Sequence, residues 1–197
     1  MNRLIGLLIL AVCFLCYGCK TVSKSTINVN LDISRQGIKT MAVMRFDDEL
    51  IQREAVSGNV IKTISNPNAG QMLADMMTGE LLKWGKYRVL TRPEIKSAIK
   101  IGGKREESLI KQKDYATIGK ILKADAIIFG KISNFEVSDM TVYARGNVSF
   151  TAECVDTRNG KTLWSMEIKE SAPYKDEVEL ASKAVKGAVE KLKKEME

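Results

Sequence analysis

Histidine is absent from the 197-residue sequence, and only one of its 4 cysteines lies outside the N-terminal segment. Histidine is the usual general base of enzymes and the commonest metal ligand, so neither role has its ordinary residue here. Cys154 lacks a partner for an intramolecular disulfide and falls on an apolar strand face, which predicts a buried, unreactive thiol. The sequence also contains no phosphate-binding glycine loop and no nucleophile motif. It therefore predicts a protein that is not an enzyme and uses no metal or cofactor.

Basic residues outnumber acidic ones by 31 to 24 and give the chain a formal net charge of +7. Lysines are scattered along the chain, with one dense run at Lys191–Lys194. A modest positive excess suits anionic surfaces such as phospholipid headgroups or cell-wall polymers, and it equally suits plain solubility. A short acidic run, Asp47–Glu49, follows a predicted strand and is interpreted as solvated loop charge rather than as a cation site.

The start of the chain has the pattern of an export signal. Met1–Arg3 is a short basic segment, and Leu4–Leu15 is an apolar core of 12 residues, too short for a membrane-spanning helix of about 20 residues. Gly18 and Cys19 follow this core and resemble the lipobox of bacterial lipoproteins. The resemblance implies that residues 1–18 are removed as a signal peptide and that Cys19 is acylated with chains such as palmitate. An ordinary secretory signal or an uncleaved anchor is the alternative.

The residue after Cys19 bears on the destination of the protein. Lys20 occupies this position. Having Lys rather than Asp there, the chain resembles lipoproteins that are sent on to the outer membrane of Gram-negative cells. Several acyl chains suffice for stable anchoring, whereas a single chain is marginal. We therefore expect a protein held by its lipid on the periplasmic face of the outer membrane, a compartment in which nucleic acid is not a partner.

The rest of the chain is expected to form a tether followed by one domain. Residues 19–37 are polar and show no sustained helical period, which predicts a lipidated N-terminus and a flexible tether. Residues 38–197 are long enough for a single domain. Its first strand is predicted over Ile38–Phe46, where alternation gives way to an apolar run. Residues 47–67 form a long connection that we expect either to be disordered or to become ordered against a partner.

Helices are indicated by apolar residues at the 3.6-residue period and by capping residues. The two longest begin at Asn68 and Asp176, and the first of them ends at Gly85. Shorter helices are expected over residues 91–100, 106–113 and 114–122.

The sheet is organised around Ala126–Gly130, an unbroken apolar run of the kind found in strands buried on both faces. A shorter strand is predicted over Tyr87–Leu90. From Met140 to Cys154, apolar or small residues alternate with polar ones over 15 residues, which predicts a long antiparallel strand with one solvent-exposed face. Asn159–Gly160 predicts the hairpin turn to a partner strand that runs through Ile168.

These elements predict the fold class α/β, as a single-domain sandwich with a mixed β-sheet, helices mainly on one face and the order β-α-β-α-α-β-β-β-α. The opposite face of the sheet should be more polar, and Tyr143, Arg145 and Asn147 of the long strand lie on it. We identify these three residues, together with the connection over residues 47–67, as the candidate surface for a protein partner.

Several segments occur in the order in which one known family carries its motifs. They are AVMRFD at 42–47, GKYRVLTR at 85–92, IGK and ADAIIFGKI within 118–132, and VDTRNGK at 155–161. Over Ile38–Ile168 the sequence resembles the periplasmic domain of the curli-secretion (CsgG) lipoprotein family, with Met44 in place of the usual proline. The shared motifs are mostly apolar and turn residues, so the resemblance concerns the fold more than the function.

Well-known members of that family are nonameric outer-membrane channels to which each subunit donates two long amphipathic hairpins. A spanning strand needs about 9–11 residues. A hairpin needs two such strands. Only Ser138–Asn147 is available for the first hairpin, and the second hairpin is missing after Ile168. We therefore interpret the chain as a CsgG-like periplasmic lipoprotein without the channel-forming insertions.

The expected function is that of a lipid-anchored, non-catalytic binding or assembly factor of the cell envelope. Its expected partners are the membrane, envelope proteins and other copies of the chain, with no small-molecule substrate. One alternative is a subunit of an oligomeric outer-membrane export channel. Another is an activator of peptidoglycan synthases of the LpoB type, which are similar in their lipid anchor and in a segment like Gly85–Arg88 but carry a longer, proline-rich tether.

Overall fold

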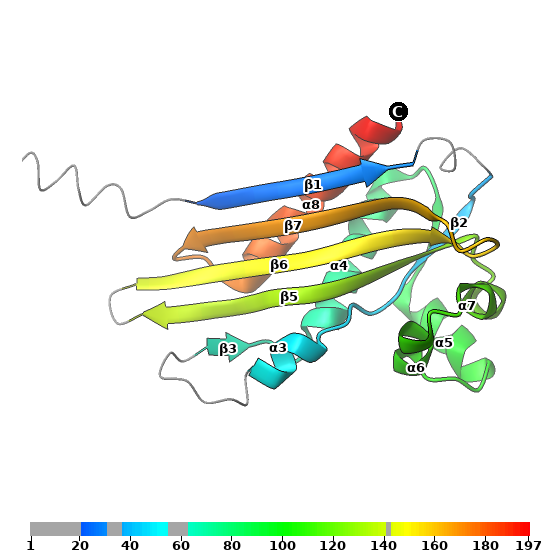
Figure 1. The fold of residues 1–197 in the computed structure, drawn as a ribbon, viewed down its shortest axis with the longest axis horizontal. Helices are drawn as coiled ribbons and strands as arrows, with labels where there is room; N and C mark the ends of the chain where they lie inside the picture. The colour runs from blue at the N-terminus through cyan, green and yellow to red at the C-terminus, as the bar shows by residue number, and fades with distance from the viewer. Residues whose placement is uncertain (1–20, 31–36, 55–62, 141–142) are drawn as a thin grey trace, which may run out of the picture.

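The computed structural model describes residues 21–30, 37–54, 63–140 and 143–197. Its strands are β1 (Val22–Val29), β2 (Thr40–Val43), β3 (Thr63–Ser65), β4 (Arg88–Leu90), β5 (Ala126–Met140), β6 (Tyr143–Asp156) and β7 (Thr162–Pro173). Its helices are α3 (Glu49–Glu54), α4 (Ala69–Trp84), α5 (Arg92–Ile101), α6 (Glu106–Gln112), α7 (Tyr115–Leu122) and α8 (Glu177–Met196). Figure 1 shows these elements.

The described strands form one seven-stranded mixed sheet in the order β1-β7-β6-β5-β2-β4, with β3 paired to β5 near its C-terminal end. β1, β7, β6 and β5 form an antiparallel ribbon, and β2 runs parallel to both β4 and β5. Ile127 and Ile128 of β5 lie between β2 and β6 and are 0% exposed. This confirms the prediction of a central strand buried on both faces.

Two hydrophobic cores lie on opposite faces of the sheet, because successive strand residues point in opposite directions. Met41 and Val43 of β2 face the larger core beneath α4 and α8, whereas Ala42 and Met44 face the smaller core beneath α5, α6 and α7. In Figure 1, α4 and α8 lie behind the long ribbon and α5–α7 gather at its parallel end. The predicted α/β class and mixed sheet are confirmed, and the ribbon has one face covered by helices and one open face.

Capping side chains define where several helices begin. Thr91 and Glu94 form a capping box at the start of α5. Asp114 of α7 and Asp176 of α8 each accept a hydrogen bond from a first-turn backbone N–H, at 3.1 and 2.6 Å. Asn68, in contrast, makes no side-chain capping bond at the start of α4.

The N-terminal part of the domain differs from the sequence-based prediction, because the segment expected to be a tether contains β1. This strand pairs with β7 over its full length, from Val22 opposite Ser171 to Val29 opposite Trp164. The predicted tether over residues 19–37 is therefore wrong for Val22–Val29. As an edge strand, β1 buries little apolar surface, and every residue of it is at least partly exposed.

The connection over residues 47–67 is also more ordered than the sequence indicates. α3 follows β2, and Ile51 of α3 is buried against the larger core. β3 pairs with Glu136–Ser138 of β5, while residues 55–62 lie outside the described residues. The three short helices predicted before β5 are all present, although the predicted order of elements counted only two of them. With β1, α3 and β3 included, the described order is β-β-α-β-α-β-α-α-α-β-β-β-α.

None of the helices in the described ranges combines the length and the apolar character needed to cross a membrane.

Candidate interaction surfaces

The thiol and the acidic residue that were considered for reactivity or cation binding are buried or paired in the structure. Cys154 is 0% exposed, and burial, followed by the nearby Asp156 and Glu153 carboxylates, raises the pKa of its thiol far above the usual range. The protonated thiol is a poor nucleophile. In the acidic run, predicted to be solvated, Asp48 is instead only 9% exposed and is paired with Arg45 at 2.9 Å, whereas Glu49 is exposed. Within the described ranges, no group of three Asp, Glu, Cys or His residues could hold a metal ion.

The open face of the antiparallel ribbon is lined with polar side chains. The core side of β6 carries Val148, Phe150, Ala152 and Cys154, all at most 2% exposed. The intervening residues lie beside polar residues of β7, in the register Asn147–Ser171, Ser149–Lys169, Thr151–Glu167 and Glu153–Ser165. This arrangement matches the predicted long strand with one exposed face from Tyr143 onward. Met140, predicted to begin that strand, is instead the last residue of β5 and pairs with Tyr143.

A chain of hydrogen bonds joins two of the three predicted partner-surface residues. Arg145 Nη1 donates to Ser171 Oγ at 3.0 Å, and this hydroxyl donates to Asn147 Oδ1 at 2.7 Å. Because Ser171 belongs to β7, the chain links two strands. Tyr143 begins β6 and pairs with Met140, and its side chain lies outside what the structure describes. The sequence does not indicate Ser171, since a cross-strand partner follows from register rather than from spacing.

The turn between β7 and α8 packs against the same end of β6. Gly146 permits this contact, because a Cβ there would lie 2.3 Å from the Lys175 carbonyl oxygen. Tyr174 N–H donates to the Ala144 carbonyl at 2.9 Å. Tyr174 itself has a left-handed backbone, with φ of 57°, and is 71% exposed. Such a conformation costs a non-glycine residue on the order of 1 kcal/mol, so the turn holds this side chain outward at an energetic cost.

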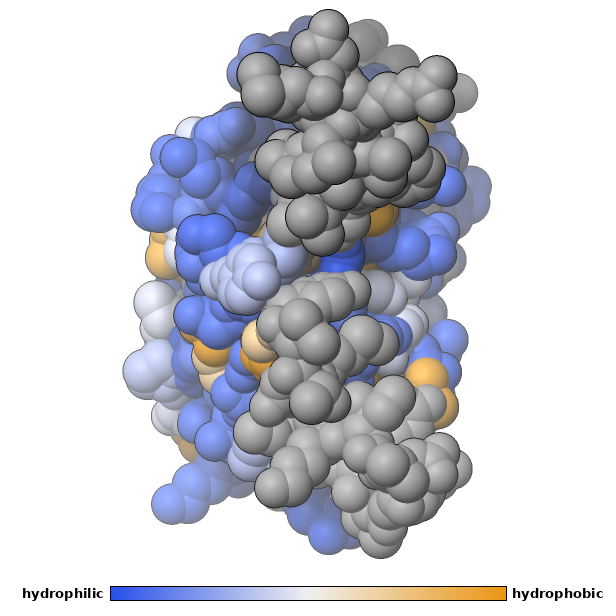
Figure 2. Space-filling view, turned by 90° about the vertical axis from the view of Figure 1, so that its left-hand side faces the viewer, coloured by the Kyte–Doolittle hydropathy of each residue, from blue (hydrophilic) through white to orange (hydrophobic). Residues whose placement is uncertain are grey.

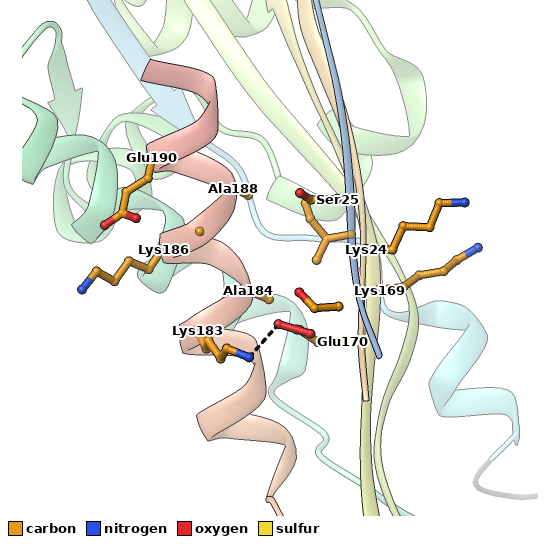
Figure 3. Close-up of a pocket in the computed structure, with 12 residues that line it drawn as sticks. Lys24, Ser25, Lys169, Glu170, Lys183, Ala184, Lys186, Ala188 and Glu190 are labelled. Carbon is orange, nitrogen blue, oxygen red and sulfur yellow. Dashed lines mark ion pairs between the residues drawn. The ribbon is translucent and has the colours of Figure 1, made fainter. Parts of the chain in front are cut away.

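A pocket of about 270 Å³ lies between the β1–β7 edge and α8, where Ala184, Gly187 and Ala188 leave space (Figure 3). Glu170 of β7 points into this region and is 5% exposed. Its Oε1 lies 3.2 Å from Lys183 Nζ, and its Oε2 has no hydrogen-bond partner within the described part of the chain. A buried carboxylate is therefore held by one lysine that reaches in from α8.

A second hollow, of about 780 Å³, lies where the open face meets α3, α6 and α7. The rings of Tyr115 and Phe129 stand 5.4 Å apart within it, tilted by 58°. Lys111, Lys131 and Glu167 are among the charged residues around them. Aromatic residues are enriched in protein interfaces, whose rims are polar.

Comparison with known proteins identifies the family. The model of the family "Putative lipoprotein GNA1162-like" matches residues 63–197, more than half of the chain. The chain therefore belongs to the GNA1162-like lipoprotein family. None of the curated proteins matches the sequence.

Solved structures share the fold at low sequence identity. A variant of PelC from Paraburkholderia phytofirmans, a dodecamer, aligns with a TM-score of 0.58 and 13% identity over 85% of this chain and 96% of that chain. Lipoprotein GNA1162 from Neisseria meningitidis aligns with a TM-score of 0.57 and 20% identity over 79% and 99%. The LpoB C-terminal domain from Salmonella enterica reaches a TM-score of only 0.43, at 12% identity over 68% and 85%, which is too low to support an argument. At these identities the likeness establishes the fold alone.

These findings refine the resemblance seen in the sequence. They establish a lipoprotein family and a fold shared with PelC and with lipoprotein GNA1162, and curli secretion itself gains no support from them. Cys19, the predicted lipidation site, lies outside the described residues.

Proposed function

We propose that this chain is a lipid-anchored protein of the bacterial envelope that assembles with copies of itself and acts by binding rather than by catalysis. Its family is one of lipoproteins, and Gly18–Cys19 follows a signal-like apolar segment. Acyl chains on Cys19 would hold the domain at the periplasmic face of the outer membrane, a destination that Lys20 favours.

The observation that carries the assembly part of the proposal is the edge strand β1. It is 8 residues long, it ends the sheet, and its outer side pairs with no other strand in the described ranges. Natural edge strands are usually protected by proline, bulges or several charges. β1 has no proline, its ladder shows no bulge, and Lys24 is its single charged residue. Lys191 Nζ of α8 donates to the outward Ser25 carbonyl at 2.9 Å. The other outward backbone groups of β1 are suited to contact with another chain.

A neighbouring copy is the occupant that we propose for this edge. PelC, which shares the fold, forms a dodecamer. Contact between the β1 edge of one copy and a different surface of the next would be heterologous, and contacts of this kind can close into rings. A subunit of an export channel and an activator of peptidoglycan synthesis are two specific forms that this function could take.

The mass of the detergent-extracted protein tests the proposal. Native mass spectrometry should show a discrete oligomer in which each subunit consists of residues 19–197 plus acyl chains. A ring of eight or more subunits would favour the export-channel form. A monomer at all concentrations would contradict assembly, and subunits without acyl mass would contradict the anchor.

A further inference from the structure

We propose that one end of the sheet lies against the phospholipid headgroups of the membrane that holds the protein. This anchor end consists of the start of β1, the paired ends of β5 and β6, and the turn between β7 and α8. The inference rests on the proposed lipidation of Cys19 and adds the surface by which the domain meets the membrane.

β1 begins so close to the anchor that the domain cannot stand far from the membrane. Only Lys20 and Thr21 separate Cys19 from Val22, the first residue of β1. Three residue steps span about 10 Å even when fully extended. A free tether over residues 20–37 would instead have reached about 60 Å. With the shorter connection, the domain is not loosely tethered and must contact or nearly contact the headgroup layer.

The hairpin of β5 and β6 extends beyond the start of β1, on the side from which the chain enters the domain. Val22 is level with Ser171, and Ser171 is level with Asn147 of β6. From Asn147, β6 continues four residues outward to Tyr143, still paired with β5. At 3.3 Å per residue this extension is about 13 Å, so the hairpin reaches as far as a fully extended Cys19. Figure 1 shows all three parts of the anchor end on the same side of the molecule.

The side chains at the anchor end suit the headgroup layer. Val22 and Tyr174 are 49% and 71% exposed there. Tyrosine is enriched at membrane interfaces, because its ring is apolar and its hydroxyl is polar. Figure 2 looks onto this end, and the described residues that are in view there are mostly hydrophilic, with a few apolar ones among them. This composition supports contact with headgroups rather than insertion into the hydrocarbon core.

Two other orientations are compatible with so short an anchor. Placing the β1 edge on the membrane would hide the strand edge that the proposed assembly uses. Placing the open face on the membrane would leave the exposed Tyr174 in water and bring the carboxylates of Glu153 and Glu167, as well as the lysines of that face, to the headgroups. The anchor end is the orientation that avoids both conflicts.

Fluorescence quenching in vesicles tests the orientation. The lipidated protein is reconstituted into vesicles of phosphatidylethanolamine and phosphatidylglycerol that contain a headgroup-attached quencher. A thiol-reactive fluorophore is placed at one site at a time. The sites are Tyr174→Cys at the anchor end, Thr151→Cys on the open face and Asn30→Cys beyond the far end of β1. Cys154 is buried and stays unlabelled.

Quenching at position 174 is expected to be several-fold stronger than at positions 151 and 30. Strong quenching at both 174 and 30 would place the β1 edge on the membrane and overturn the proposal. Strong quenching at 151 would place the open face there and overturn it too. In both cases the protein still floats with the vesicles, so lipidation stands. Protein that does not float with the vesicles would overturn the anchor itself, which separates the two failures.

Discussion

At the scale of single residues, two glycines show how much the fold depends on where side chains are absent. Gly146 lets the β7–α8 turn lie directly on β6, because a Cβ there would stand 2.3 Å from the Lys175 carbonyl oxygen and 2.7 Å from Leu180 Cδ1. Gly187 in α8 would meet nothing within 4 Å. One position is closed to any side chain and the other is open.

We predict opposite effects for alanine at these two glycines. Gly146→Ala should lower the free energy of unfolding by about 1–3 kcal/mol, because the turn must move away from β6. Gly187→Ala should raise it by about 0.5–1 kcal/mol, since alanine favours a helix interior and has room here. Urea denaturation of the two variants measures both values. Equal effects would contradict the close approach at Gly146.

The pair of Glu170 and Lys183 gives a second prediction. Lys183→Met should lower the free energy of unfolding by about 1–3 kcal/mol, because it leaves the buried carboxylate without its cation. Adding Glu170→Gln to this variant should recover most of the loss, since the buried charge is then gone. Thermal and urea denaturation of the single and double variants provide the measurement. A double variant no more stable than Lys183→Met would contradict the role of the pair.

Asp156, at the end of β6, gives a prediction about pH. It is 0% exposed, and Arg158 donates to it from Nε at 3.0 Å and from Nη2 at 2.6 Å. The Arg158 side chain, followed by the Arg158 backbone N–H, holds the pKa of this carboxyl below its usual range. A carboxyl with a lowered folded pKa stabilises the protein above its unfolded pKa of about 4 and loses that contribution as pH falls through the folded value.

Asp156→Asn should therefore lower the free energy of unfolding at pH 7. The difference from the parent protein should shrink as the pH falls below about 4, because the parent then loses the same contribution. Urea denaturation at a series of pH values from 7 down to 2.5 measures this difference. A difference that stays constant over that range would contradict the assigned cause.

At the scale of elements, those with strong local periodicity could be predicted from the sequence. Apolar and polar residues alternate along β6, because one of its faces meets α4 and α8 and the other meets solvent. The pattern can therefore be read from the residues of β6 alone. β1 could not be predicted in this way. Its half-buried apolar residues are Ile27 and Val29, and its strand conformation depends on the ladder with β7, far later in the chain.

The candidate surfaces were predictable to a similar extent. Arg145 and Asn147 could be placed on the polar face from alternation alone. Their link through Ser171 could not, because the register of β6 and β7 depends on the hairpin turn and on an irregularity beside it. Glu170 carried a usable signal, since it stands two residues after Ile168 at an inward position where a charge is unexpected.

The edge strand β1 leads to a prediction about assembly. Thr26 on β1 and Thr151 on the interior strand β6 lie in one row of the open face, on either side of Glu167. Thr26→Lys adds a second charge to the edge strand and should weaken self-association roughly tenfold. Thr151→Lys adds the same charge away from the edge and should leave the association unchanged. Native mass spectrometry over a concentration series compares them, and equal weakening would contradict contact through the edge.

At the scale of the whole molecule, the sheet has two unlike ends. The anchor end carries the start of β1 and the β5–β6 hairpin, and the other end carries α5–α7 around the short parallel strands (Figure 1). The larger core runs beneath the ribbon between them. A lipid at Cys19 would therefore hold the molecule by one end of its long axis.

Cys19 supplies the prediction that concerns the whole molecule. Cys19→Ala should remove the acyl mass and release the protein from the membrane fraction, because no acceptor for the lipid remains. Cys16→Ala is the matched control, since Cys16 follows Leu15 rather than a small residue and should not be acylated. Intact-mass measurement and membrane fractionation give the result. Membrane release by Cys16→Ala instead of Cys19→Ala would move the lipid to Cys16.

The position of β1 also determines how the domain withstands mechanical force. Its 8 residues each face a partner in β7, and the chain leaves for the lipid at Val22. A force that pulls the domain away from its lipid acts along the strand and loads all these pairs at once, in shear. A force across the strand would open them one after another. The strand that joins the domain to its lipid is therefore oriented so that its hydrogen-bond ladder with β7 resists this force most strongly.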